Sequence, residues 1–278
     1  MSTSPNGVRA EAINRPERRT NTSRPRIAAQ DRGRSDQRSD VPTTPADAGP
    51  PIPDWAQPNL LEDAVQDELS SLAHANAATV AGHLVATGEF LDEDPQLALA
   101  HARAARASAA RLACVREAVG VAAYHAGEYA EASRELRAYR RLSGRADYLA
   151  VLADCERAAG RPEAALRLLA DAPRTHPGHS EWVEQQIVEA GARRDLDEVS
   201  GAILVLRDAL RSIRKGAGAG VDADDLIRLR YAYADSLEAA GRDDEARAEF
   251  GAIAESDGGE MTDAAHRAGL SVQPEEDV

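Results

Sequence analysis

Residues 123–132 read Ala-Tyr-His-Ala-Gly-Glu-Tyr-Ala-Glu-Ala, and this stretch predicts the end of one helix, a glycine turn and the start of a second helix. Related turns read Gly-Arg-Pro-Glu-Ala-Ala at 160–165 and Gly-Arg-Asp-Asp-Glu-Ala at 241–246. Gly127 and Gly160 are 33 residues apart, a period typical of helix–turn–helix repeats. Because such a unit cannot bury its apolar face alone, we expect copies to stack into a solenoid that presents a surface rather than an enclosed pocket.

Composition divides the 278 residues into a leader, a helical part and a tail. Residues 1–58 are rich in Ser, Thr, Pro and Arg with little apolar clustering, which predicts disorder. Residues 59–270 are predicted to form a helical repeat domain, and residues 271–278 an acidic disordered tail. Trp55, near the end of the leader, is expected to dock on the first helices as an apolar anchor.

We expect five helix pairs, because Ala-rich segments alternate with Gly or Pro turns. The expected pairs cover 60–88 with 95–107, 111–126 with 129–142, 146–159 with 162–170, 179–193 with 196–214, and 223–240 with 243–256. Asp94 is predicted to cap the helix that begins at Pro95. A short helix at about 262–268 is expected to cover the exposed end. The predicted class is therefore an all-α solenoid of helical hairpins.

This pattern resembles the tetratricopeptide repeat family, whose unit has a small residue midway along its first helix, Gly at the turn, and Ala and then a large apolar residue in its second helix. The matching residues are Gly120, Ala123, Gly127, Tyr129, Ala132 and Leu136 in the second pair, Ala153, Gly160, Ala165 and Leu169 in the third, and Ala234, Leu237, Gly241, Ala246 and Phe250 in the fifth. In the fourth pair Trp182, Val199 and Ile203 fit, while Arg194 or Asp195 takes the place of the turn glycine. The resemblance covers about residues 60–268. Together with the Leu-Asp-Glu-Asp-Pro turn and the Arg-rich leader, it extends to an actinobacterial group of such proteins.

The resemblance implies a non-catalytic adaptor or scaffold that binds a protein or peptide on the concave face lined by the first helix of each pair. By position, the partner-binding residues would be Glu117, Val121, Tyr124, Ala150, Asp154, Arg157, Glu184, Gln185, Val188, Tyr231, Asp235 and Glu238. This lining is mixed, its charged residues are mostly acidic, and it lacks the Lys and Asn of the chaperone-binding subgroup. We therefore expect a basic or mixed peptide as partner. The alternative is a solvated groove that binds nothing tightly.

Charge is distributed unevenly along the chain. The formal net charge of −14 argues against general nucleic-acid binding, because phosphate binding needs positive surface. The Arg-rich leader and residues 95–145, with nine Arg and four Glu, are local exceptions. The leader is either a solubilising tail or a contact for RNA or acidic lipid. The alternative function is therefore an RNA-associated factor that uses the leader and the 95–145 region.

A convex basic patch is predicted within the 95–145 region. Arg134, Arg137 and Arg141 can share one helix face, and Arg103, Arg106 and Arg111 lie on the neighbouring repeat. The patch is either a solvated face balanced by Glu128, Glu131 and Glu135 or a docking surface for an acidic partner.

Catalytic motifs are missing from the sequence. It contains no phosphate-binding loop, nucleophile elbow or helix-spaced metal pair, so we predict no enzyme, no cofactor and no metal. Cys114 and Cys155 lack CxxC spacing and are expected to be reduced helix thiols. No apolar run is long enough to span a bilayer, and the N-terminus has no apolar core of a secretory signal. The expected state is a cytoplasmic monomer or homodimer.

Overall fold

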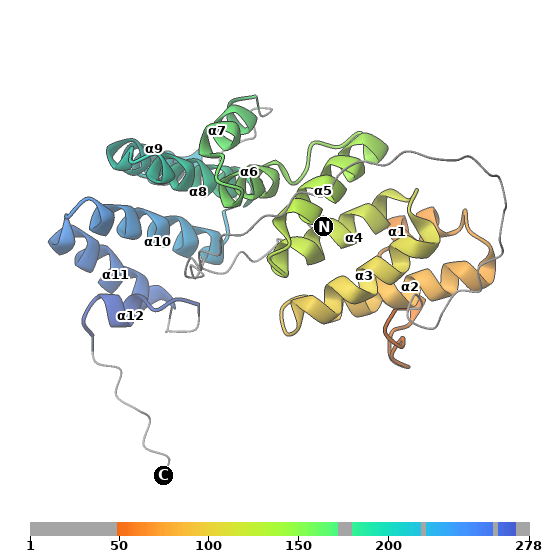
Figure 1. The fold of residues 1–278 in the computed structure, drawn as a ribbon. Helices are drawn as coiled ribbons and strands as arrows, with labels where there is room; N and C mark the ends of the chain where they lie inside the picture. Colours follow the sequence, from red (N-terminus) through yellow and green to blue (C-terminus); the bar gives the residue numbers. More distant parts are fainter. Residues whose placement is uncertain (1–48, 172–179, 218–220, 258–260, 271–278) are drawn as a thin grey trace, which may run out of the picture. The chain divides into compact units, whose positions relative to one another are not determined.

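The computed structural model describes residues 49–171, 180–217, 221–257 and 261–270. Within these ranges every regular element is a helix and no strand occurs (Figure 1), which confirms the predicted all-α class. Residues 1–48 and 271–278, which make up most of the predicted leader and the whole predicted tail, lie outside the described residues. The predicted domain boundary at residue 59 therefore stays a prediction.

The helices follow one another along the chain with short connections. They are η2 (Pro58–Leu60), α1 (Asp63–Leu69), α2 (His74–Glu89), α3 (Pro95–Ala109), α4 (Ala113–His125), α5 (Tyr129–Ser143), α6 (Leu149–Ala158), α7 (Pro162–Ala170), α8 (Ser180–Asp195), α9 (Val199–Ser212), η3 (Ile213–Ala217), α10 (Ala223–Ala239), α11 (Asp243–Asp257) and α12 (Ala264–Arg267).

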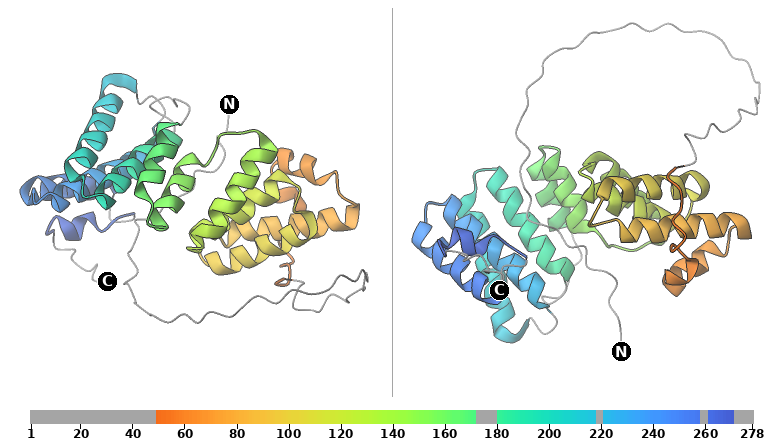
Figure 2. Two further views of the ribbon diagram at one scale, coloured as in Figure 1. Left: turned by 45° about the horizontal axis from the view of Figure 1, so that its top comes forward. Right: turned by 90° about the horizontal axis from the view of Figure 1, so that it is seen from below.

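Consecutive helices pack against each other as pairs: α2 with α3, α4 with α5, α6 with α7, α8 with α9, and α10 with α11. Each second helix also contacts the first helix of the next pair, as α3 does with α4 and α9 with α10. First helices contact one another where α2 meets α4, α6 meets α8, and α8 meets α10. Figure 2 shows these pairs in two further views.

One turn geometry recurs between the two helices of a pair. Gly127, Gly160 and Gly241 adopt left-handed backbone with φ of 76°, 73° and 72°. At each turn, the glycine N–H donates to the carbonyl three residues back, and the following N–H donates to the carbonyl five residues back from itself. These paired bonds satisfy the last carbonyls of the first helix, and glycine is preferred because it adopts this conformation without strain.

The fourth pair uses Asp197 at this turn, with φ of 62° and the same two hydrogen bonds. The sequence-based assignment of the turn to Arg194 or Asp195 is therefore wrong. Both of those residues are still helical, because α8 continues to Asp195. Asp tolerates the left-handed region better than most non-glycine residues, since its short side chain can hydrogen-bond locally.

Small residues lie buried at fixed distances from each turn. Five residues after the turn, an alanine in the second helix is at most 1% exposed: Ala132, Ala165, Ala202 and Ala246. Seven residues before the turn, a small residue in the first helix is buried: Gly120, Ala153, Ala190 and Ala234. These positions let paired helices approach closely, and larger side chains such as Leu136, Leu206 and Phe250 fill the interior.

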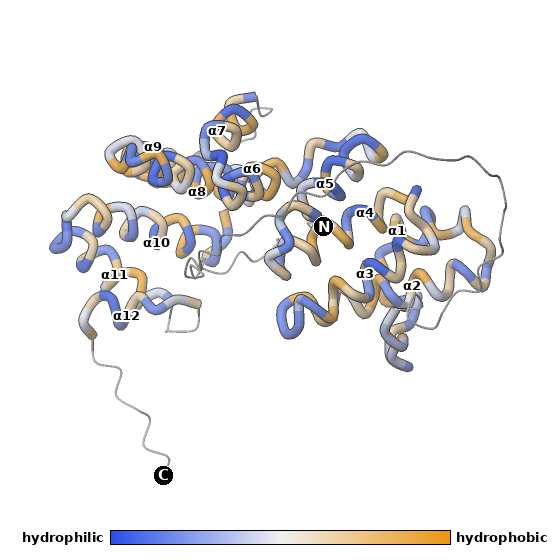
Figure 3. Tube along the Cα trace, in the orientation of Figure 1, coloured by the Kyte–Doolittle hydropathy of each residue, from blue (hydrophilic) through white to orange (hydrophobic). Residues whose placement is uncertain are grey.

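The core is distributed along the helix pairs. Separate buried clusters lie between α2, α3 and α4, between α8, α9 and α10, and between α10, α11 and α12. Figure 3 shows apolar and polar residues interleaved along the described helices, as expected where each helix buries one side only.

The first expected pair differs most from its prediction. The helix expected over 60–88 is divided into α1 and α2, because the chain leaves the helix between Ser70 and Ala73. Ser70 and Ser71 donate their hydroxyl groups to the carbonyls of Asp67 and Glu68 and so satisfy the end of α1. The cap of α3 is confirmed, since Asp94 Oδ1 accepts from the Leu97 N–H at 3.0 Å.

Residues 49–57 form an irregular segment against α2 and α3. Ala56 is buried, and Ile52 lies where a side chain on Gly82 would stand. Trp55 makes the predicted apolar contact through an edge-on arrangement with Phe90, with ring centroids 5.8 Å apart. The tryptophan remains 45% exposed, so Ala56 and Ile52 contribute to the packing of this segment as well.

Candidate partner-binding face

All twelve predicted partner-binding residues lie on α4, α6, α8 and α10, the first helices of their pairs. We call the surface of these four helices the first-helix face. Ala150, Asp154, Gln185 and Val188 are buried, so they support this face from beneath. Glu238 is exposed, and the other predicted residues are half-buried: Glu117, Val121, Tyr124, Arg157, Glu184, Tyr231 and Asp235.

A chain of polar contacts connects α4, α6 and α8. The Tyr124 hydroxyl donates to Asp154 Oδ2 at 2.8 Å. Arg157 Nη1 donates to the other oxygen of Asp154 at 2.6 Å, and its Nε donates to Asp195 Oδ2 at 2.9 Å. Burial, together with the Asp154 carboxylate, raises the pKa of Tyr124 well above its ordinary value. These residues therefore hold three neighbouring first helices together.

Gly191 on α8 makes room for this chain. A Cβ atom at residue 191 would stand 2.6 Å from the guanidinium carbon of Arg157. The planar group therefore lies flat against the backbone of α8, and any larger residue would displace it. Glycine in the interior of a helix costs stability, so its presence here has a packing reason.

A second set of contacts connects α8, α10 and α12. Arg194 pairs with Asp235, and Arg267 donates to the other Asp235 oxygen at 2.9 Å. Arg267 also pairs with Glu238, and its guanidinium carbon lies 4.1 Å from the centroid of the Phe250 ring. Most of the predicted charged residues are thus paired within the protein, and Glu238 is the most exposed of them.

Two carboxylates bridge neighbouring helix pairs in ways that the sequence did not predict. Glu181 on α8 accepts the backbone N–H groups of Leu149 and Ala150, each at 3.1 Å, and so caps the N-terminus of α6. Glu117 on α4 accepts the Tyr148 hydroxyl at 2.6 Å. Burial raises the pKa of both carboxyl groups. These contacts join residues about thirty positions apart, which no local pattern reveals.

Glu184 is the most strongly perturbed carboxyl group on the face. It pairs with Arg228 of α10. Burial raises the pKa of Glu184 to about 7, with Arg228 acting to lower it and Asp225 to raise it. A carboxylate so poorly hydrated gains more than an exposed one from an additional cationic or hydrogen-bond donating group.

We expect Glu184 to make stability depend on pH. Its folded pKa of about 7 lies above the unfolded value of 4.5, so the folded state keeps a proton that the unfolded state has lost. The stabilisation from this raised pKa is full below pH 4.5 and is lost as pH rises through about 7, a decrease in unfolding free energy of about 3 kcal/mol. Denaturant unfolding of Glu184→Gln between these pH values should show a flatter pH dependence than wild type.

The control for this prediction is Glu255→Gln, at an exposed position of α11. It should keep the wild-type slope of unfolding free energy against pH. Equal slopes for wild type and both variants would show that Glu184 keeps its ordinary pKa in the folded protein.

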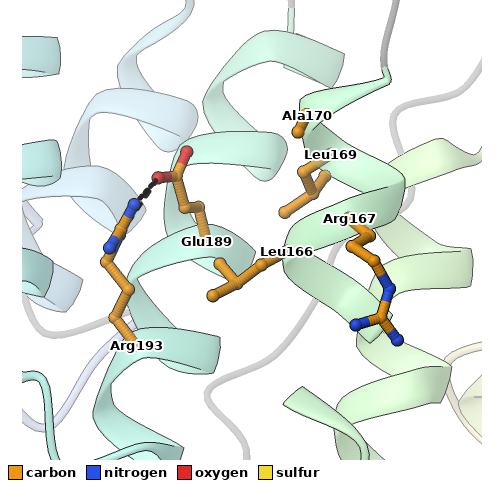
Figure 4. Close-up of a pocket in the computed structure, with 6 residues that line it drawn as sticks. All are labelled: Leu166, Arg167, Leu169, Ala170, Glu189 and Arg193. Atoms are coloured by element: carbon orange, nitrogen blue, oxygen red, sulfur yellow. Dashed lines mark hydrogen bonds and ion pairs between the residues drawn. The ribbon is translucent and has the colours of Figure 1, made fainter. Parts of the chain in front are cut away.

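A shallow pocket of about 450 Å³ lies between α7 and α8. Leu166, Leu169 and Ala170 of α7 form its apolar side (Figure 4), and Arg167 of the same helix also lines it. Glu189 and Arg193 of α8 form the opposite side and pair at 2.9 Å. The pocket borders the end of α7, beyond which residues 172–179 lie outside the described residues. It offers an apolar recess beside the first-helix face.

Both cysteines and the histidines His83 and His101 are buried. Burial raises the pKa of both Cys114 and Cys155 to about 12, which keeps them as unreactive thiols at neutral pH. His83 and His101 approach across α2 and α3 with 3.0 Å between their Nδ1 atoms, and burial lowers the pKa of each. In the described part, no three His, Cys, Asp or Glu side chains converge to form a metal-binding group.

Comparison with known proteins finds no matching family model, no matching curated protein and no matching solved structure. The structure defines the class as an all-helical protein whose described helices pack in consecutive pairs. Among the described helices, none is both long and apolar enough to cross a membrane.

Proposed function

We propose that the chain is a non-catalytic helical-repeat adaptor of the tetratricopeptide type, which binds a protein or peptide segment on its first-helix face. The recurring turn at Gly127, Gly160, Asp197 and Gly241, with a buried alanine five residues after each, is the observation that carries the proposal. Repeats with equivalent turns and equivalent packing stack into a solenoid, and solenoids expose extended faces to partners.

The charge of the face supports a basic or mixed segment as partner. Carboxylates outnumber guanidinium groups among its described residues, and the raised pKa values of Glu117, Glu181 and Glu184 reflect incomplete hydration of several of them. A Lys or Arg side chain arriving from a partner would supply the donors that water no longer provides. The α7–α8 pocket, with Leu166 and Leu169, would accept an apolar side chain of the same segment.

A display selection tests this proposal with the full chain as bait. Random peptides of about fifteen residues in extended form reach across two or more repeats. We expect enrichment of Lys and Arg, together with an apolar residue, in the selected peptides. Their affinity should fall at least about tenfold in Glu238→Lys, because one favourable charge becomes a repulsive one.

The matched control is Leu204→Lys on α9, a second helix, where Leu204 is 47% exposed. It should leave the affinity of the selected peptides unchanged. Selection of acidic or uncharged peptides, or equal affinity loss in both variants, would count against binding at the first-helix face.

The RNA-associated alternative remains a separate prediction. It depends on the leader, which lies mostly outside the described residues, and on the arginines of residues 95–145. A gel shift with single-stranded RNA that weakens with salt and is lost on deletion of residues 1–40 would support it. No shift at low salt would remove it.

A further inference from the structure

Six arginines from four neighbouring parts of the chain converge on three glutamates. The arginines are Arg103 and Arg106 of α3, Arg116 of α4, Arg134 and Arg137 of α5, and Arg161 of the turn before α7. The carboxylates they share belong to Glu131, Glu135 and Glu156. We call the surface of these arginines, together with Arg141 of α5, the arginine face.

The carboxylates lie beneath the guanidinium groups. The Glu135 side chain is 3% exposed and bonds to Arg106 at 2.8 Å and to Arg116 at 2.5 Å. Glu156, with its side chain 11% exposed, bonds to Arg137 at 2.7 Å and to Arg161 at 2.6 Å. The guanidinium groups above them are more exposed, up to 63% for Arg134. The outer layer of this surface is therefore cationic.

The positive charge is only partly compensated. Six guanidinium groups share three carboxylates, and Arg141 makes no ion pair with any described residue. A guanidinium carries five N–H donors, of which the contacts to Glu131, Glu135 and Glu156 use only some. The unused donors can hold further carboxylates in bidentate geometry. The acidic remainder of the chain does not cancel this local field, because charges are screened beyond about 8 Å at physiological ionic strength.

We propose that the arginine face docks an acidic segment of a partner protein. The spacing along α5 suits such a segment: Arg134 and Arg141 are two turns apart, or about 10 Å at 1.5 Å per residue. In a polyproline II segment, which has three residues per turn, acidic side chains three residues apart lie on one side and are separated by about 9 Å. Such a segment with Asp or Glu at every third position can therefore place one carboxylate against each arginine.

The surroundings favour a protein over a nucleic acid. Single-stranded nucleic acids gain much of their affinity from stacking on exposed aromatic rings. On α5, Tyr139 is buried and Tyr129 is half-buried, so this helix offers no exposed ring for stacking.

Binding of a labelled acidic peptide by fluorescence anisotropy tests the proposal with the full chain. The probe has about twelve residues with Glu at every third position and Ser and Gly between, and the control peptide carries Gln in place of Glu. We expect saturable binding of the Glu peptide only. In Arg134→Gln/Arg141→Gln the dissociation constant should rise at least about tenfold, since each of two peptide carboxylates loses its partner.

The matched control variant is Arg242→Gln/Arg247→Gln, which removes two arginines paired only with Glu245 and Asp244. It should leave the dissociation constant within about twofold of wild type. Equal weakening in both variants, or no saturable binding to wild type, would overturn the proposal. Circular dichroism of each variant confirms folding. If the Arg134→Gln/Arg141→Gln variant does not fold, Arg141→Gln alone replaces it, because Arg141 is exposed and makes no ion pair with a described residue.

A competition arm separates the partner classes. Single-stranded RNA should displace the bound Glu peptide less effectively than unlabelled Glu peptide does. Displacement by RNA at lower concentration, with RNA binding lost in the α5 variant, would assign the arginine face to nucleic acid instead. The wild-type chain could instead form a dimer that the Glu peptide dissociates. That result would identify a second copy of this chain as the occupant of the arginine face. Either result would contradict the proposal.

Discussion

Replacing Phe250 with Ala is expected to lower the free energy of unfolding by about 3–5 kcal/mol. Phe250 is fully buried where α10, α11 and α12 meet. Its ring lies edge-on to Tyr231, with centroids 5.4 Å apart, and beneath the guanidinium group of Arg267. Truncation removes the largest buried side chain of this cluster and leaves a cavity that the short α12 cannot fill.

The effect should be local as well as large. The described helix pairs pack against the pairs next to them along the chain, so the loss should concentrate in the affected pair and its neighbours. We expect hydrogen exchange to accelerate in α10, α11 and α12 and to change little in α2 and α3. Leu204→Ala, at an exposed site of α9, is the control and should change stability by less than about 0.5 kcal/mol. An equal increase in the hydrogen-exchange rate of all described helices would contradict local packing of the helix pairs.

Leu136→Ala is expected to cost about 2–5 kcal/mol, because Leu136 is fully buried between α4 and α5. The neighbouring Gly120→Ala should cost about 1–3 kcal/mol for the opposite reason, overpacking. A Cβ at residue 120 would stand 2.6 Å from Leu136 Cγ and 3.2 Å from its backbone nitrogen. Both changes act on the same helix contact, so their effects should not be additive.

A double-mutant cycle measures this coupling. In the Leu136→Ala background, Gly120→Ala should cost much less than it does alone, because the clashing atoms are gone. Gly251→Ala on α11 is the matched control, since its Cβ would meet nothing within 4 Å. That change should stabilise the helix by up to about 1 kcal/mol. Additive effects of the Gly120 and Leu136 changes would mean that α4 and α5 do not approach closely at these residues.

The glycine turns show how far local sequence predicts this fold. Gly127, Gly160 and Gly241 could be assigned because glycine is the usual residue for left-handed backbone. Asp197 could not, because aspartate is common on helices and in loops, and its conformation here depends on where α8 ends. The helix boundaries on either side of the glycine turns were predictable for the same reason.

The break between α1 and α2 escaped prediction because helical periodicity continues through it. Ser70 and Ser71 bond to nearby carbonyls and end α1. Serine side chains can compete in this way with helix hydrogen bonds. Whether the helix ends there depends on packing against other elements, which the local sequence does not show. Leu69 at the end of α1 is buried in the same cluster as Val80 of α2, which requires the chain to turn between them.

For the predicted partner-binding residues, the sequence predicted the helix on which each one lies but not its contacts. Their positions on first helices followed from the repeat period, and the structure places them there. Two contacts join different helix pairs and depend on how those pairs pack: Tyr124 with Asp154, and Arg194 with Asp235. Gly191 was the one local sign of these contacts, because glycine is unusual inside a helix. The structure explains it, since the guanidinium group of Arg157 occupies the space that a side chain at residue 191 would need.

Site-specific crosslinking tests the central claim, a partner held on the first-helix face, most directly. A photoreactive amino acid is placed at Val121 or Glu238, on first helices, and at Leu204 on α9 as control. In source cells, the account predicts that residues 121 and 238 crosslink to one and the same partner with a yield that saturates. A peptide copied from the crosslinked segment of that partner should prevent the adduct, and residue 204 should give none. Adducts of equal yield from all three positions, or none from residues 121 and 238, would contradict it.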